Sequence, residues 1–261
     1  MLVRRRQGLS LLALLWAAAA CVTDPPRSAP TEHIPGPSST PAAPRFRALD
    51  TFCALPPDVA SIPVPPVDLD DPRSVFSDDG LPLINIRFPP GAWEQACEDA
   101  QGVADWMEAR REGEPVGPLV RPVVAVDVFI QDRSYFDVGF RFRGQSNLYA
   151  MFYNRWNRPI PGALAACKAD RMRKKASYRL AFDAFVPGRT IAGQRALDLA
   201  GREGSDAAYL REATAQHVAR EFGLPAPLVG HARVCRDGAY DGLFTLAEEV
   251  DQRAILGRLF P

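Results

Sequence analysis

Two segments of the sequence place basic side chains at alternate positions among apolar and aromatic ones. They read "VGFRFRGQSN" (residues 138–147) and "KKASYRLAFD" (residues 174–183). Alternate side chains of an extended strand share one face. The basic residues that two such strands would present together are Arg141, Arg143, Lys175 and Arg179. Because guanidinium groups match phosphate oxygens and a lysine ammonium adds a point charge, the spacing indicates a sheet face that holds phosphate.

The first of these strands runs into Gly144-Gln145-Ser146-Asn147, whose composition suits a phosphate-binding loop. Glycine lets the backbone approach a ligand closely, and the three residues after it supply hydrogen-bond donors without bulk. From the residues alone a second interpretation stays open. Exposed sheet faces also carry Arg and Lys for solubility or for protection of a sheet edge.

Motifs of several other chemistries are missing from the sequence. It contains no GxxxxGK[ST], GxGxxG, HExxH or GxSxG pattern. Its three histidines, His33, His217 and His231, lie in the linker, in a predicted helix and before a predicted strand. We therefore predict neither a metal centre nor histidine-based nucleophilic catalysis.

Charge is distributed unevenly, although the formal net charge is zero. Residues 48–138 contain 17 acidic and 6 basic residues, whereas residues 139–180 contain 10 basic residues and one acidic residue, Asp170. The basic segment could attract an anionic partner. We do not expect nucleic acid, because the basic face lacks the interleaved aromatic residues on which bases stack.

The N-terminus predicts export. Arg4–Arg6 precede an apolar stretch, Leu9–Ala20, that is too short to span a membrane. The segment ends "LWAAAAC", which resembles a bacterial lipobox, so residues 1–21 are predicted to be a signal peptide and Cys21 to be lipidated. Ordinary cleavage among the alanines is the alternative. We expect an exported lipoprotein anchored to the cell envelope by its lipid, or a secreted protein.

Residues 22–66 contain 12 of the 25 prolines and are predicted to form a semi-rigid, disordered tether to the folded residues 67–261. Beyond the signal, the cysteines are Cys53, Cys97, Cys167 and Cys235. In an oxidising compartment four cysteines permit two disulfides in three possible pairings, and buried free thiols remain the alternative.

Hydrophobic periodicity predicts the elements that must position the basic residues. They are a strand at 81–88, a helix at 92–111, hairpins at 121–144 and 232–249, a strand at 175–182, and a helix from Ser205 or Asp206 to Phe222. Residues 148–172 show no clear period and are predicted to be a long loop or insertion. In the second helix an apolar stripe formed by Leu210, Thr214, Val218 and Phe222 lies opposite Glu212. Strands, helix and further strands together predict an α+β domain with an antiparallel sheet and a packed helix.

Five segments, in order, resemble the CotH kinase family, which contains the spore-coat CotH proteins and their exported bacterial relatives. They are "LPLINI", "VGFRFRGQSN", "KKASYRLAFD", "DAAYLREATAQHVAREFGLPAP" and "YDGLFTLAEEVD", within about residues 81–256. The resemblance implies the N-terminal lobe of an atypical protein kinase. It also implies that an intact member uses ATP and Mg²⁺ to phosphorylate an envelope or extracellular protein.

The same resemblance implies roles for individual residues. "RGQSN" is similar to the family's "RGNSS"-type loop, with Gln145 and Asn147 as departures, and Lys175 or its neighbour Lys174 corresponds to the basic residue that meets the ATP phosphates. Glu212 would be the ion-pair partner of that lysine, or else an exposed surface residue, and Glu248 and Glu249 would lie in the adenine-contacting hinge. The predicted cofactor-binding residues are Arg143, Gly144, Ser146, Lys175, Arg179, Glu212 and Glu248.

In the family a second lobe follows the segment that corresponds to Glu-Glu-Val-Asp, and it supplies the catalytic and metal-binding aspartates on which phosphoryl transfer depends. The present sequence ends at Pro261. We therefore expect this chain to be inactive on its own, as a truncated reading frame, half of a split kinase, or a binding module. The alternative function is a non-catalytic surface lipoprotein that binds an anionic partner through its basic sheet face.

Overall fold

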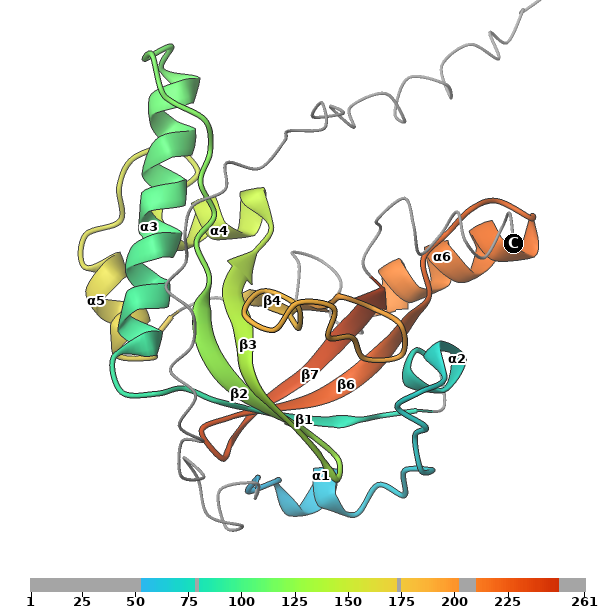
Figure 1. Ribbon diagram of the computed structural model, residues 1–261. Coiled ribbons are helices and arrows are strands. Elements are labelled where there is room, and N and C mark those ends of the chain that lie inside the picture. The colour runs from blue at the N-terminus through green and yellow to red at the C-terminus, as the bar shows by residue number, and fades with distance from the viewer. Residues whose placement is uncertain (1–52, 78–79, 173–174, 202–209, 249–261) are drawn as a thin grey trace, which may run out of the picture. The chain divides into compact units, whose positions relative to one another are not determined.

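The computed structural model describes residues 53–77, 80–172, 175–201 and 210–248. Seven strands form a closed barrel in the order β1-β2-β3-β4-β5-β7-β6 (Figure 1). They are β1 Leu83–Arg87, β2 Val124–Ile130, β3 Arg133–Arg143, β4 Ser177–Ala181, β5 Ala196–Ala200, β6 Val229–Arg236 and β7 Ala239–Glu248. Strand β1 closes the barrel, because it pairs antiparallel with β2 and parallel with β6.

The predicted fold class, an α+β domain with an antiparallel sheet that resembles a kinase N-terminal lobe, is wrong. The structure is a mixed, closed barrel that consists mostly of sheet. Closure depends on the parallel pairing of β1 with β6, two strands far apart in the sequence, which local periodicity cannot reveal. It also depends on β5, whose residues are all buried and which is too short to show alternation.

Large apolar side chains fill the barrel interior. Among those with at most 3% of their surface exposed are Ile84, Ile86, Val138, Phe140, Phe142, Tyr178, Leu180, Leu197, Leu199, Phe244 and Leu246. In β3 and β4 these are the aromatic and aliphatic residues that alternate with the basic ones. Burial of the apolar face therefore directs the basic residues to the outside of the barrel.

A β-bulge changes the alternation at the start of β3. Val126 pairs with Val138 but Val128 pairs with Tyr135, so two residues of β3 lie opposite one residue of β2. Asp137 has φ +52° and donates its backbone N–H to Asp127 Oδ1. The extra residue reverses the alternation, so Phe136 is exposed although it lies two residues before the buried Val138.

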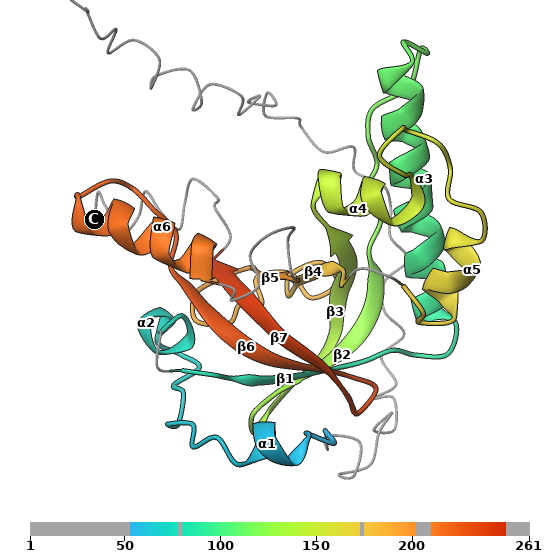
Figure 2. The same ribbon diagram turned by 180° about the vertical axis from the view of Figure 1, so that it is seen from behind.

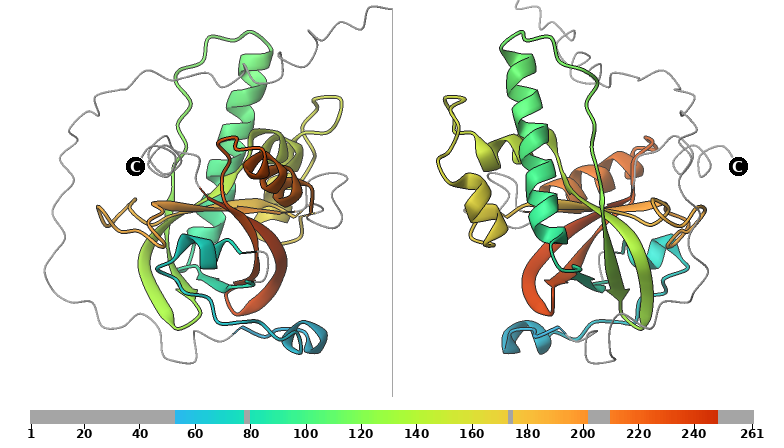
Figure 3. Two further views of the ribbon diagram at one scale, coloured as in Figure 1. Left: turned by 90° about the vertical axis from the view of Figure 1, so that its right-hand side faces the viewer. Right: turned by 60° about the vertical axis from the view of Figure 1, so that its left-hand side comes forward.

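Helix α3 (Ala92–Arg111) has the predicted bounds and packs against β2 and β3. The helices α4 (Gln145–Phe152) and α5 (Ala163–Lys168) lie against α3, so the predicted loop at 148–172 is partly helical. Helix α6 (Leu210–Glu221) packs against β6 on the other side of the barrel (Figures 1 and 2). In both views of Figure 3 the green helix α3 extends away from the strands of the barrel.

The predicted apolar stripe of α6 does not face the core. Leu210, Val218 and Phe222 are exposed, Phe222 with 79% of its surface. Ala213, between them, is buried against Val229 and Ala247. The helix thus turns Ala213 toward the barrel, where a small side chain allows a close approach that a larger one would prevent.

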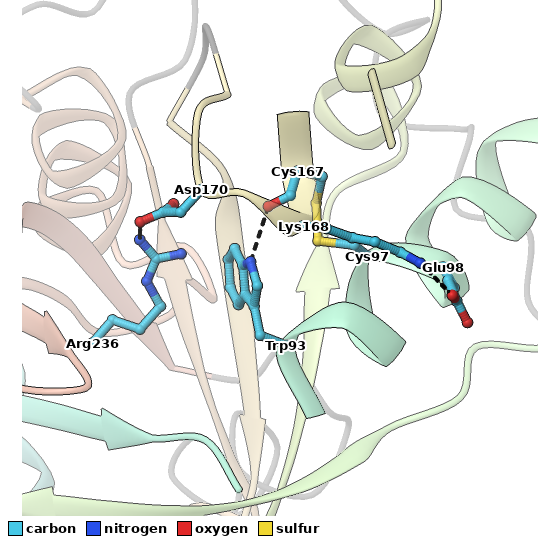
Figure 4. The surroundings of a disulfide bond; sticks show 7 residues. All are labelled: Trp93, Cys97, Glu98, Cys167, Lys168, Asp170 and Arg236. Carbon is cyan, nitrogen blue, oxygen red and sulfur yellow. Dashed lines mark hydrogen bonds and ion pairs between the residues drawn. A yellow bond between two sulfur atoms is a disulfide. The ribbon is translucent and has the colours of Figure 1, made fainter. Parts of the chain in front are cut away.

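Two disulfides select one of the three possible pairings. Cys53 is bonded to Cys235 of β6, and Cys97 of α3 is bonded to Cys167 of α5 (Figure 4). Their Cα atoms are 6.0 and 5.9 Å apart. The first disulfide attaches the chain to the barrel at residue 53, inside the stretch that composition predicts to be a tether. The one-turn helices α1 (Pro57–Ala60) and α2 (Pro72–Val75) follow it.

The predicted signal at 1–21 with Cys21, the first part of the tether, Lys174 and Glu249 lie outside the described residues. Of the helices that the structure does describe, none combines the length and the apolar character that crossing a bilayer requires.

Candidate anion-binding site

Arginines gather on the outer face of the barrel where β3, β4 and β5 lie side by side. Arg141 of β3 is directly opposite Arg179 of β4, which is directly opposite Asp198 of β5. Arg143, two residues after Arg141, is opposite Ser177. Like charges that face each other across two strands are destabilising. The direct pairing of Arg141 with Arg179 is therefore a cost that folding alone does not explain.

This face forms the floor of a pocket of about 520 Å³. Its walls come from the segment before β2, from Gly144 at the start of α4, and from the first turns of α6. Among the described residues, five arginines and one carboxylate line it: Arg121, Arg141, Arg143, Arg179, Arg211 and Glu212. We call it the arginine pocket. Its volume is in the range of small-molecule sites.

Asp198 of β5 forms ion pairs with two of these arginines and does not itself line the pocket. Its carboxylate lies 3.0 Å from Nε of Arg143 and 3.4 Å from Nη1 of Arg179, and only 5% of the residue is exposed. A buried carboxylate shared by two guanidinium groups holds both side chains in place. One negative charge cannot neutralise both, so the floor stays positive.

Arg141 and Arg121 have no such partner. Neither side chain forms a hydrogen bond or ion pair with another residue in the described part of the chain. Burial, together with the positive charges of Arg179 and Arg121, lowers the pKa of Arg141 to about 10. A half-buried guanidinium group that has no hydrogen-bonded or ion-paired partner and faces an open pocket is suited to an anionic ligand.

The predicted phosphate loop is the first turn of a helix. Gly144 has φ +83°, which favours glycine, and Gln145 begins α4 with no side-chain cap. The first N–H groups of a helix have no partner within it, and the helix dipole favours an anion near them. Gly144 lines the arginine pocket, so α4 begins at its wall. Ser146 is exposed in that first turn.

Lys175 lies elsewhere. Its Nζ donates a hydrogen bond of 2.6 Å to the carbonyl oxygen of Leu243 and lies 3.8 Å from the ring centroid of Phe244. It lines a separate pocket of about 380 Å³, with Arg236 and Asp241. Lys175 and Glu212 therefore line different pockets, and the structure does not bring this predicted ion pair together. Arg179 is the basic residue of β4 that reaches the arginine pocket.

Lys175 should make stability depend on pH in the alkaline range. Burial lowers its pKa from 10.5 to about 8, against the opposing effect of Asp241. Between these two values the unfolded chain binds this proton more tightly than the folded chain does, so the free energy of unfolding should rise with pH through that window. Urea denaturation at several pH values should show this rise in the parent and a smaller one in Lys175→Met. Parallel curves for the two proteins would contradict the assignment.

Glu248 is a buried residue at the end of β7. Its carboxylate accepts hydrogen bonds from Nε2 of Gln194, at 2.9 Å, and from the backbone N–H of Leu228, at 3.0 Å. These contacts hold the end of β7 to neighbouring segments, and Glu248 does not line the arginine pocket. Its hinge role stays a prediction.

Of the predicted cofactor-binding residues, four line the arginine pocket: Arg143, Gly144, Arg179 and Glu212. Sequence reasoning missed Arg121, Arg211 and Asp198. The signal for Asp198 is a single acid in the apolar stretch "RALDLAG", and Arg211 is adjacent to the predicted Glu212. Within the described ranges, no group of three His, Cys, Asp or Glu residues could hold a metal ion.

Residues 140–260 match the family model described as CotH kinase protein. Over these residues the chain is similar to the CotH kinase family. The match begins inside β3 and includes every lining residue of the arginine pocket except Arg121. No curated protein matches the chain. The CotH resemblance read from the segments is thus confirmed for the part of the chain that forms the floor of the pocket.

Proposed function

We propose that the arginine pocket binds the phosphate groups of ATP and that the chain is part of a CotH-family protein kinase. The observation that carries the proposal is Arg141, a half-buried guanidinium group without an ion-pair partner among the described residues, opposite Arg179 in the family-matched region. The fold keeps two like charges together at a cost, which a bound polyanion would offset.

The residues present fit a chain of phosphates. Among the described residues, five arginines accompany one lining carboxylate, Glu212, and one carboxylate paired with two of the arginines, Asp198. Arg141 and Arg121 would hold phosphate oxygens through parallel N–H groups, while Arg143 and Arg179, kept in place by Asp198, would hold others. The start of α4 adds backbone donors at Gly144. When bound, ATP supplies a transferable γ-phosphoryl group.

The described residues do not fit a dedicated Mg²⁺ site. They contain no group of three ligating side chains, and Glu212 is the carboxylate that lines the pocket. We assign no protein ligands to the metal and derive no step through it. In this proposal the arginines neutralise the phosphate charge at the sites where they bind.

Export and attachment to the cell envelope are part of the proposal. Two disulfides are typical of an oxidising compartment, and they agree with a signal that ends at Cys21. The protein substrate would then be an envelope or extracellular protein. Mass spectrometry of the mature N-terminus tests the lipidation. A lipid-free terminus at another residue would exclude the anchor.

Equilibrium titration of the purified chain tests nucleotide binding. ATP should bind with an affinity that falls as salt rises, inorganic tripolyphosphate should compete, and adenosine should bind more than tenfold more weakly than ATP. ATP that binds no better than adenosine would exclude phosphate recognition.

The arginine pocket also supports the second candidate function, a non-catalytic protein that binds an anionic partner. The two functions differ in their expected response to the nucleotide and to magnesium. Preference for ATP over tripolyphosphate and a change with Mg²⁺ support the kinase. Equal binding of both anions, indifferent to Mg²⁺, supports the second candidate.

A further inference from the structure

A second pocket, separate from the arginine pocket, is formed by the segment between β3 and β4. We propose that it binds an acidic peptide segment that carries an apolar side chain, and that it positions such a segment of a protein substrate. The pocket has a volume of about 820 Å³ and lies between α4, the turn after it, and α5. We call it the α4–α5 pocket. Its substrate role rests on the proposed kinase function; the binding of the peptide does not.

The walls of this pocket are held by local contacts. The turn after α4 is closed by an isolated bridge between Tyr153 and Pro159 and by a hydrogen bond of 2.7 Å from the N–H of Ile160 to the carbonyl oxygen of Phe152. Helix α5 is held to α3 by the Cys97–Cys167 disulfide and by a hydrogen bond from Trp93 Nε1 to the Cys167 carbonyl oxygen (Figure 4). The pocket is therefore pre-formed, which lowers the entropic cost of binding.

Apolar side chains make up most of the lining. They include Met151, Ile160, Pro161, Ala163 and Met172. Methionine side chains are flexible and polarisable, so they adapt to apolar groups of different shape. The surface between them suits a Leu, Ile or Phe side chain of a bound peptide.

The charges at this pocket are positive. Arg155 and Arg171 line it, and none of its described lining residues is acidic. Arg155 stacks on Trp156, 4.1 Å from the ring centroid, and neither arginine side chain has a carboxylate partner in the described part of the chain. Two uncompensated guanidinium groups beside an apolar surface favour a peptide with carboxylates next to its apolar residue.

Nearby carboxylates have other partners. Asp105 accepts a hydrogen bond from the hydroxyl of Tyr153, and Glu108 accepts one from the hydroxyl of Tyr149 and is paired with Arg111. Asp170, beside Arg171 in the sequence, accepts a hydrogen bond from Arg236 at 2.5 Å (Figure 4). None of these three carboxylates lines the α4–α5 pocket or pairs with Arg155 or Arg171.

The two pockets share helix α4. Its first residues adjoin the arginine pocket at Gly144, and Tyr149 to Met151 line the α4–α5 pocket. Tyr149 and Met151 follow Gly144 by five and seven positions, which corresponds to roughly 8–10 Å at 1.5 Å per residue. A peptide anchored in the α4–α5 pocket would therefore place a residue only a few positions along its chain near the phosphates proposed for the arginine pocket. The substrate class would be proteins with acidic residues near the hydroxyl group that receives the phosphoryl group.

Fluorescence anisotropy of the full chain tests the proposal with three labelled peptides of equal length. One carries Glu and Leu around a central Ser, the second has Lys in place of Glu, and the third has Gly in place of Leu. We expect the first to bind at least tenfold more tightly than the other two. Arg171→Glu should weaken its binding at least tenfold. Arg158→Glu is the matched control, an exposed arginine of the same segment that does not line the pocket, and it should change binding less than twofold.

Competition separates this pocket from the arginine pocket, which could also attract an acidic peptide. Inorganic tripolyphosphate and Arg141→Met should leave peptide binding unchanged, whereas Arg171→Glu should leave ATP binding unchanged. Displacement of the peptide by tripolyphosphate, or equal binding by Arg171→Glu and the parent, would overturn the inference. Peptide binding by a chain that does not bind ATP would support this pocket while excluding the kinase proposal.

Discussion

Replacing Arg141 with methionine will weaken ATP binding about 10- to 100-fold while the fold becomes slightly more stable. A hydrogen bond to a charged group contributes about 1.5–3 kcal/mol, which sets the expected loss of affinity. The gain in stability follows from removal of a like charge opposite Arg179, an interaction that costs about 0.2–1 kcal/mol. Methionine retains an unbranched side chain to pack on the sheet.

Titration of ATP and urea denaturation, carried out on the same preparations, check both effects. Arg73→Met is the control, because Arg73 is an exposed arginine of α2 that does not line the arginine pocket. It should change neither quantity. A loss of stability in Arg141→Met together with unchanged ATP affinity would show that Arg141 is a structural residue.

Removal of the Cys97–Cys167 disulfide will lower the free energy of unfolding by about 2–4 kcal/mol. The disulfide joins residues 70 apart in the sequence, so it restricts the unfolded chain strongly. It also holds α5 against α3, where Trp93 donates to the Cys167 carbonyl oxygen. The double replacement Cys97→Ser and Cys167→Ser is the variant to compare with the parent in urea.

Peptide binding separates the local effect of this disulfide from its effect on the whole fold. The double serine variant should bind the acidic peptide more weakly, because α5 forms one wall of the α4–α5 pocket. The corresponding removal of Cys53–Cys235, which closes a loop of 182 residues, should lower stability comparably but leave peptide binding unchanged. An unfolding free energy equal to that of the parent for the first variant would contradict the prediction.

Local patterns predicted the individual elements well where each element is determined by its own residues. Helix α3 has the predicted bounds, and the hairpin predicted at 232–249 turns at Asp237-Gly238, whose positive φ angles, 49° and 83°, are those of a type I′ turn. The closed barrel was not predicted, since it depends on the pairing of β1 with β6 and on the short strand β5. The buried face of α6 was assigned to the wrong side, because size and hydrophobicity alone favour Leu210, Val218 and Phe222 over Ala213.

Strand alternation made one part of the candidate site predictable, namely the arginines of β3 and β4. Arg141, Arg143 and Arg179 share the outer face for that reason, because their neighbours fill the barrel. Lys175 precedes β4 and follows a different path, so alternation does not apply to it. Asp198 could be recognised only once β5 was known to lie beside β4. The α4–α5 pocket depends on a disulfide pairing that the sequence leaves open among three possibilities.

Barrel closure has a consequence for how this protein can recognise a partner. Each of the seven described strands has a neighbour on both sides, so none offers a free row of backbone N–H and C=O groups. A partner cannot extend the sheet by adding its own strand, and copies of the chain cannot join edge to edge through these strands. Recognition must therefore occur through side chains and helix ends on the outer surface. Point substitutions there should alter binding with little effect on the barrel itself.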